Sequence, residues 1–166
     1  MTTNWNATIW SQLGAEIDML DRAIEVCPEA LWSDRSRHPQ FWYTVYHTLF
    51  FLDLYLSGTL EGFQPPPPFN LDELDPSGIM PAEVYPQEQM REYLAHGRAK
   101  CRRILAELTE ERVIETARFP WVEMPYGELL LVSIRHVQHH TAQLNLLLRQ
   151  EVNHVPRWIT RAPDPI

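Results

Sequence analysis

Three histidines lie within five residues of one another at the start of the segment HVQHHTAQLNLLLRQ, residues 136–150. His136 and His140 are four residues apart, so in a helix both side chains project from the same face, on one flank of a core stripe that includes Val137. Two imidazoles in this arrangement are a recurrent ligand pair for a transition-metal ion. His139 points about 180° away from the core of such a helix, so we expect it to face solvent. A protease motif of the H-E-x-x-H type is absent, because Val137 replaces the glutamate.

A third ligand has to come from elsewhere in the chain, and His47 is the strongest candidate. It lies in the segment FWYTVYHTLFFLDLYLS, where it shares a helix face with Phe51 and Leu54 and has almost no other polar interior group beside it. A buried imidazole needs partners for its nitrogens. A hydrogen bond to a carbonyl group or to Tyr46 is the alternative, but the converging pair in another helix favours metal ligation.

The remaining histidines are weaker candidates for metal ligands. His38 lies at the approach to a helix, His154 lies in the tail, and His96 follows Glu92 by four residues, which predicts a surface pair. We expect each to be at most a substitute ligand. No carboxylate is predicted beside the proposed ligands, so the sequence assigns no general base.

Two of the elements that would position these residues lie in the N-terminal third of the chain. Apolar residues recur at three- or four-residue intervals over 9–24, which predicts a helix that Thr3 or Asn4 caps and Pro28 ends. The second helix is predicted from Pro39 to Gly58. It is apolar nearly all round, so we expect it to be the most buried helix.

A proline-rich connection over 62–86 precedes two further helices and is long enough to cross the end of a bundle. Those helices are predicted over 87–111 and from Glu128 to Val152. Between them, RFPWVEMPYG predicts a short hairpin or loop, and the tail after 152 is expected to fold back over the bundle. These elements predict one domain over residues 1–166, an all-α four-helix bundle with a long crossover between helices two and three.

Composition narrows the class of protein. With 14 basic residues, 22 acidic residues and a net charge of −8, the chain lacks the basic surface that nucleic-acid binding needs, so small molecules or other proteins are the expected partners. No run of eighteen uncharged apolar residues predicts a membrane span. The N-terminus lacks the pattern of a signal peptide, and Cys27 and Cys101 are too few for a disulfide framework, so we expect a cytoplasmic protein in which both thiols are packed or peripheral.

The segments FWYTVYHTLFFLDLYL and IRHVQHHTAQLNLLLR resemble the DinB-like (DinB/YfiT) superfamily, bacterial four-helix bundles with a metal site of three histidines. The family places one metal histidine in the second helix, which matches His47. It places two more in the last helix as H-x-x-x-H, followed by Gln and Leu, which matches His136, His140 and Gln143-Leu144. The tail HVPRWI also resembles the segment with proline and tryptophan that often follows the last helix in this family. The chain departs from the family at Thr141-Ala142, where members often carry Arg-Gly.

Three imidazoles without a thiolate leave open positions on a metal, so such a site suits catalysis or ligand capture better than structural zinc. Zinc or nickel fits the nitrogen ligands best, with iron, manganese and cobalt as alternatives. The ion can lower the pKa of a bound water, polarise a carbonyl group or stabilise a thiolate. The resemblance implies the last of these, because characterised members include transferases and isomerases that use bacillithiol, mycothiol or glutathione.

The sequence therefore predicts a divalent-metal-dependent enzyme acting on small molecules, with thiol S-transfer as the leading interpretation and Gln143 as a residue that orients substrate or water. A metal-dependent hydrolase and a noncatalytic metal- or ligand-binding bundle are the alternatives. The apolar second helix and the six tryptophans are compatible with a homodimer, although a monomer core explains them equally well.

Overall fold

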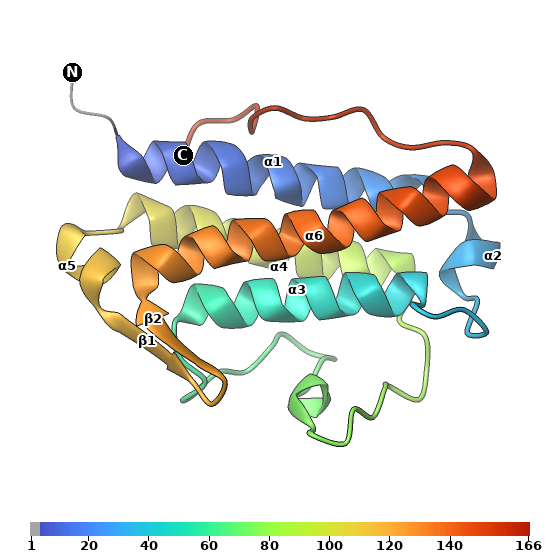
Figure 1. Cartoon of the computed structure of the whole chain (residues 1–166), viewed down its shortest axis with the longest axis horizontal. Coiled ribbons are helices and arrows are strands. Elements are labelled where there is room, and N and C mark those ends of the chain that lie inside the picture. Colours follow the sequence, from blue (N-terminus) through green and yellow to red (C-terminus); the bar gives the residue numbers. More distant parts are fainter. Residues whose placement is uncertain (1–3) are drawn as a thin grey trace.

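The computed structural model describes residues 4–166 and consists of four long helices with short elements between them. The long helices are α1 (Trp5–Val26), α3 (Phe41–Ser57), α4 (Gln87–Ala106) and α6 (Tyr126–Val152). Helices α1 and α3 each pack against both α4 and α6, so the four surround one apolar core (Figure 1). The predicted all-α four-helix bundle is confirmed, with its long connection between the second and third long helices.

The ends of the N-terminal helix follow the predicted capping signals. Asn4 occupies the N-cap of α1, where its side-chain oxygen accepts a hydrogen bond from the backbone N–H of Ala7 at 3.1 Å. The other predicted cap, Thr3, lies outside the described residues. Pro28 follows Cys27, whose extended backbone ends the helix.

Helix α3 differs slightly from its predicted bounds. It begins at Phe41 instead of Pro39, because Gln40 has the extended backbone of an N-cap residue. It ends as predicted at Gly58, whose φ of 74° is a left-handed conformation that glycine adopts without strain. Twelve of the seventeen residues of α3 are buried, as expected for the most apolar helix of the bundle.

Shorter elements fill the connections. The sequence pattern did not predict the one-turn helix α2 (Glu29–Trp32), and the third helix stops early because α5 (Glu110–Ile114) forms a separate element capped by Thr109. The segment before α6 is a hairpin, one of the two predicted alternatives, with strands β1 (Thr116–Phe119) and β2 (Val122–Pro125) paired antiparallel.

The crossover, residues 58–86, runs along α3 and does not cross the end of the bundle (Figure 1). It takes this path because α4 starts at the end of the bundle where α3 also starts, so the two helices run parallel (Figure 1). Phe69 of the crossover is buried and stacks on Tyr93 of α4 with ring centroids 4.5 Å apart. The crossover also contains one turn of 3-10 helix, η1 (Asp72–Leu74).

The C-terminal tail folds back along α1, as the sequence predicted (Figure 1). The backbone N–H of Ala162 donates to the carbonyl of Ser11 at 2.8 Å, and Trp10 Nε1 donates to the carbonyl of Asp164 at 2.7 Å. Ala162 can approach this closely because residue 14 of α1 is glycine, on which a Cβ would lie 2.8 Å from the Ala162 side chain.

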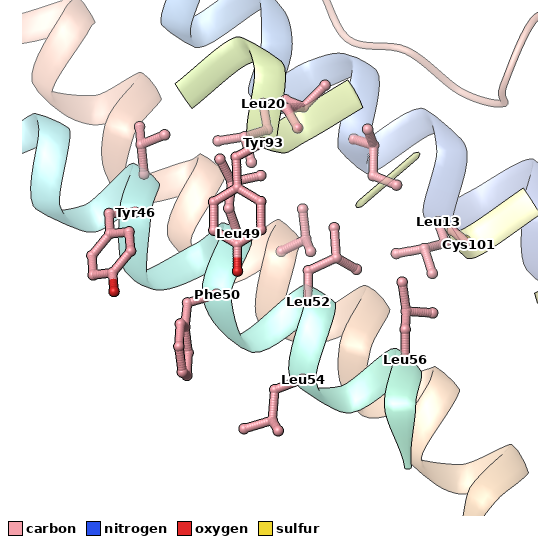
Figure 2. Close-up of a cluster of buried hydrophobic side chains, with 14 of the residues drawn as sticks. Leu13, Leu20, Tyr46, Leu49, Phe50, Leu52, Leu54, Leu56, Tyr93 and Cys101 are labelled. Carbon is pink, nitrogen blue, oxygen red and sulfur yellow. The ribbon is translucent and has the colours of Figure 1, made fainter. Parts of the chain in front are cut away.

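Aliphatic and aromatic side chains from α1, α3 and α4 meet in the core (Figure 2). Figure 2 shows the side chains Leu13, Leu20, Leu49, Leu52, Leu56, Tyr93 and Cys101, all of which are buried. Within residues 4–166, no helix is both long and apolar enough to cross a membrane.

A buried ion pair joins α3 to α4. Asp53 has no solvent exposure, and Lys100 Nζ donates to the Asp53 carboxylate, to the Asp53 carbonyl at 2.8 Å and to Ser57 Oγ at 2.7 Å. The expectation that the helix of His47 has almost no other polar interior group was therefore wrong. His96 lies 3.5 Å from Asp53 Oδ1 and, within the described residues, forms no ion pair with Glu92.

Candidate metal centre

Three predicted ligands come together on the side of the bundle where α3 packs against α6. One ring nitrogen from each of His47, His136 and His140 lies within 4.8 Å of the corresponding nitrogens of the other two. His136 and His140, one helical turn apart, have ring centroids 4.6 Å from each other. The structure therefore brings the three histidines to one point, although 89 residues separate His47 from His136.

The spacing fits a transition-metal ion. The Nε2 atoms of His47 and His136 are 3.3 Å apart. Two nitrogens bound to a tetrahedral zinc ion at about 2.0–2.1 Å lie about 3.3–3.4 Å from each other, so this pair needs almost no movement to hold one. Without an ion, one of the two nitrogens must carry a proton and donate it to the other.

Hydrogen bonds orient two of the three rings. His47 Nδ1 lies 2.6 Å from Glu73 Oε1, and His140 Nδ1 lies 2.8 Å from Gln143 Oε1. Both oxygens are acceptors in this arrangement, so each Nδ1 carries the proton and each Nε2 keeps its lone pair for the centre. This is the tautomer that a metal-binding histidine needs, and a carboxylate or amide oxygen behind the ring is the usual way to fix it.

Burial keeps the imidazoles of α6 neutral. It lowers the pKa of His136 to about 3, with smaller contributions from the neighbouring His140, His47 and His139. Burial also lowers the pKa of His140, partly offset by the hydrogen bond to Gln143. A metal ion binds the neutral ring, so neither imidazole has to lose a positive charge at neutral pH. The His136 proton faces His47 from Nε2 and has to move to Nδ1, which has no hydrogen-bond partner among the described residues, before an ion can bind.

Glu73 is the carboxylate beside the centre that the sequence interpretation missed. It lies in η1 in the middle of the crossover, its side chain is only 3% exposed, and its Oε1 also accepts a hydrogen bond from Tyr43 at 3.2 Å. The only local signal is the placement of acidic residues between Leu71 and Leu74. That signal does not say which acidic side chain turns inward, because the answer depends on the path of the crossover.

The other histidines lie outside the three-histidine cluster within the described part of the chain. His38 and His154 are exposed, and His96 contacts the buried ion pair between α3 and α4. His139 is exposed as predicted, yet its Nε2 lies 3.3 Å from Gln143 Nε2. The Gln143 amide therefore contacts both His139 and His140, and the expectation that it orients substrate or water stays a prediction.

Aromatic side chains border the centre, and the His47 side chain stays partly exposed beside them. Phe51 has its ring centroid 4.7 Å from that of His47, and Tyr55 has its centroid 6.0 Å from that of His136. Trp121, at the turn of the hairpin, packs edge-on against Phe51 and is 48% exposed. We call Phe51, Tyr55 and Trp121 the aromatic wall. Because the His47 side chain is 29% exposed beside it, a small molecule can reach the centre.

Neither cysteine takes part in the centre. Cys27 and Cys101 are both free and buried, as expected. Burial raises the pKa of each thiol to about 12, with the nearby Glu29 adding to the effect at Cys27. Both thiols therefore stay protonated at neutral pH and are poor nucleophiles.

Comparison with known proteins gives two matches. A family model described as the DinB superfamily matches residues 12–144, a span that contains His47, His136 and His140. The chain is also 31% identical over 81 residues to Uncharacterized protein YrdA of Bacillus subtilis (strain 168). That alignment covers 46% of this chain and 48% of YrdA, so the chain matches about half the length of this relative.

Proposed function

Because the chain belongs to the DinB superfamily and its three clustered imidazoles fit a transition-metal ion, we propose that it is a divalent-metal-dependent enzyme acting on small molecules. Zinc or nickel is the proposed ion, since all three ligands are imidazole nitrogens. The proposed reaction is the transfer of a low-molecular-weight thiol to an electrophilic substrate. The observation that carries the proposal is the 3.3 Å separation of the Nε2 atoms of His47 and His136, in a cluster where the His47 side chain is 29% exposed.

Each residue of the centre has a distinct task under this proposal. His47, His136 and His140 hold the ion through Nε2, while Glu73 and Gln143 keep the protons of His47 and His140 on Nδ1. When bound, the ion supplies a Lewis acid that favours the thiolate form of a thiol. The aromatic wall offers apolar surface to the non-reacting part of the electrophile.

A diffusible thiol is proposed because the protein itself offers none. Both cysteines are buried and protonated at neutral pH, so the sulfur nucleophile has to enter from solvent. A metal-dependent hydrolase is the second candidate, because the structure supplies a carboxylate, Glu73, beside the ligands. Its Oε1 already accepts hydrogen bonds from His47 and Tyr43, so Glu73 is better placed to orient a ligand than to remove a proton from substrate.

Metal analysis of purified protein tests the centre first. We expect one equivalent of divalent metal in the wild-type protein and in His154→Ala, a control that removes an exposed histidine outside the cluster. His140→Ala should lose the ion. A wild-type protein without metal, or a His140→Ala variant that retains it fully, would refute the proposed site.

Two activity assays then separate the candidate reactions. Metal-loaded protein is incubated with bacillithiol, mycothiol or glutathione and a panel of electrophiles, and thiol consumption is followed. Hydrolysis of esters, amides and lactones is measured in parallel. Thiol consumption that depends on His140 supports the transferase, while hydrolysis alone supports the second candidate. Absence of both activities in a folded, metal-loaded sample points to a noncatalytic metal-binding bundle.

A further inference from the structure

Glu73 is the point where the crossover contacts the candidate metal centre. Its Oε1 lies 2.6 Å from His47 Nδ1 and 3.2 Å from the hydroxyl group of Tyr43. The side chain is 3% exposed, although the preceding residues Leu71 and Asp72 are exposed. The Glu73 carboxylate therefore joins this stretch of the crossover to a residue of the ligand cluster, next to Leu74, which is half-buried against the core.

We propose that Glu73 is the positioning residue of the metal centre, and that it couples metal loading to the docking of the crossover on α3. This inference rests on the proposed function, because it requires His47 to be a metal ligand. Glu73 holds the His47 proton on Nδ1, so the lone pair of Nε2 points toward His136. A carboxylate in this position also makes the imidazole a stronger donor to the ion.

The environment of the second carboxylate oxygen of Glu73 indicates that this residue does more than attach the crossover to α3. Glu73 Oε2 is buried and has no hydrogen-bond partner among the described residues. A buried carboxylate with an unpaired oxygen is costly, because a charged group loses more hydration on burial than a neutral one. The negative charge becomes favourable when a cation binds on the far side of the His47 ring.

Coupling between the crossover and the centre follows from the same contact. If docking of Glu73 strengthens metal binding by some factor, metal binding must strengthen the docking of Glu73 by the same factor. The amide protons of Leu74 and Asp75 report this docking, since each donates a hydrogen bond within η1, to the carbonyls of Leu71 and Asp72 at 2.9 and 3.0 Å. Their exchange with solvent should slow when zinc binds.

Zinc affinity, measured by competition with a chromophoric chelator, tests the positioning role. Glu73→Gln keeps the shape of the side chain and removes the charge, and we expect zinc to bind it about 10- to 100-fold more weakly than the wild-type protein. Glu83→Gln is the matched control, since it makes the same charge change at an exposed position of the same crossover. We expect its affinity to be unchanged. Equal zinc affinity of Glu73→Gln and the wild-type protein would overturn the inference.

Two further measurements distinguish the positioning role of Glu73 from a merely structural role. In the wild-type protein at pH 8, nitrogen NMR should show the metal-free His47 ring protonated at Nδ1, and protonation at Nε2 alone would overturn the inference even if Glu73→Gln fails to fold. Zinc should slow amide exchange at Leu74 and Asp75 in the wild-type protein and lose this effect in Glu73→Gln. Equal slowing in both proteins would refute the coupling.

The failure of the inference is distinguishable from the failure of the proposed function. If the wild-type protein binds no zinc, the proposed metal centre itself is wrong. A wild-type protein that binds zinc through His140, together with an unaffected Glu73→Gln variant, leaves the centre intact and removes only the role of Glu73.

Discussion

Replacing His136 with glutamine should remove a large part of the acid sensitivity of the metal-free protein. Burial lowers the pKa of His136 to about 3, while a histidine in the unfolded chain titrates near 6.5. Below pH 6.5 the unfolded state therefore binds a proton that the folded state does not. The free energy of unfolding falls as the pH drops from about 6.5 toward 3.

The magnitude follows from the slope of 1.36 kcal/mol per pH unit for one proton. Between pH 7 and pH 5, His136 alone should lower the free energy of unfolding by about 2 kcal/mol. For a chain of 166 residues this corresponds to a decrease in Tm of about 4–8 °C. The measured quantity is the difference between the two pH values, so a change in absolute stability caused by the substitution cancels.

Urea denaturation at pH 7 and pH 5, in the presence of a chelator, measures this difference. The chelator is needed because protons and metal compete for the same rings. His154→Gln serves as the control, since it removes an exposed histidine outside the centre. The reasoning is refuted if His136→Gln loses as much stability between pH 7 and pH 5 as the wild-type protein does.

Three further predictions concern stability. Lys100→Met leaves the buried Asp53 carboxylate without its cation and should lower the free energy of unfolding by about 3–5 kcal/mol in urea titrations. The control Arg91→Met, which removes an exposed ion pair, should change it by about 1 kcal/mol or less. Similar losses in the two variants would contradict this prediction. Gly58→Ala should cost at least about 1 kcal/mol in the same assay, because φ is 74° there, and an unchanged midpoint would argue against a strained position. Zinc at 100 times its Kd should raise the free energy of unfolding of the wild-type protein by about 2.7 kcal/mol, measured by thermal unfolding, and should not change that of His47→Ala. Equal stabilisation of both proteins would show that the ion binds elsewhere.

The four long helices and the clustered histidines could be predicted from the sequence because both depend largely on local spacing. Apolar residues at three- and four-residue intervals mark the buried faces of long helices, and the same rotation per residue separates His139 from His136 and His140. His47 required one further step, the recognition that an imidazole in an apolar helix needs a partner. All of these residues lie in regular helices, where direction follows from position.

Glu73 and the pair of Asp53 and Lys100 could not be predicted, because their partners are set by tertiary packing. The crossover has no periodic pattern, so no rotation rule says that Glu73 turns toward His47 while Asp72 stays exposed. Asp53 lies in an apolar helix whose register against α4 was unknown, and only that register brings Lys100 to it. Asp53 is the one charged residue in that helix, a signal that it needs a partner but not which residue supplies it.

The distance along the chain between His47 and His136, 89 residues, gives the centre a use in folding studies. His136 and His140 can meet as soon as one turn of α6 forms, but His47 joins them only when α3 has docked on α6. Contacts between such distant segments form late relative to local helical turns, because closing a long loop is entropically costly. If all three imidazoles bind cobalt as proposed, the complex will absorb visible light. Its colour during refolding would time the docking of α3 on α6 separately from helix formation, which circular dichroism follows.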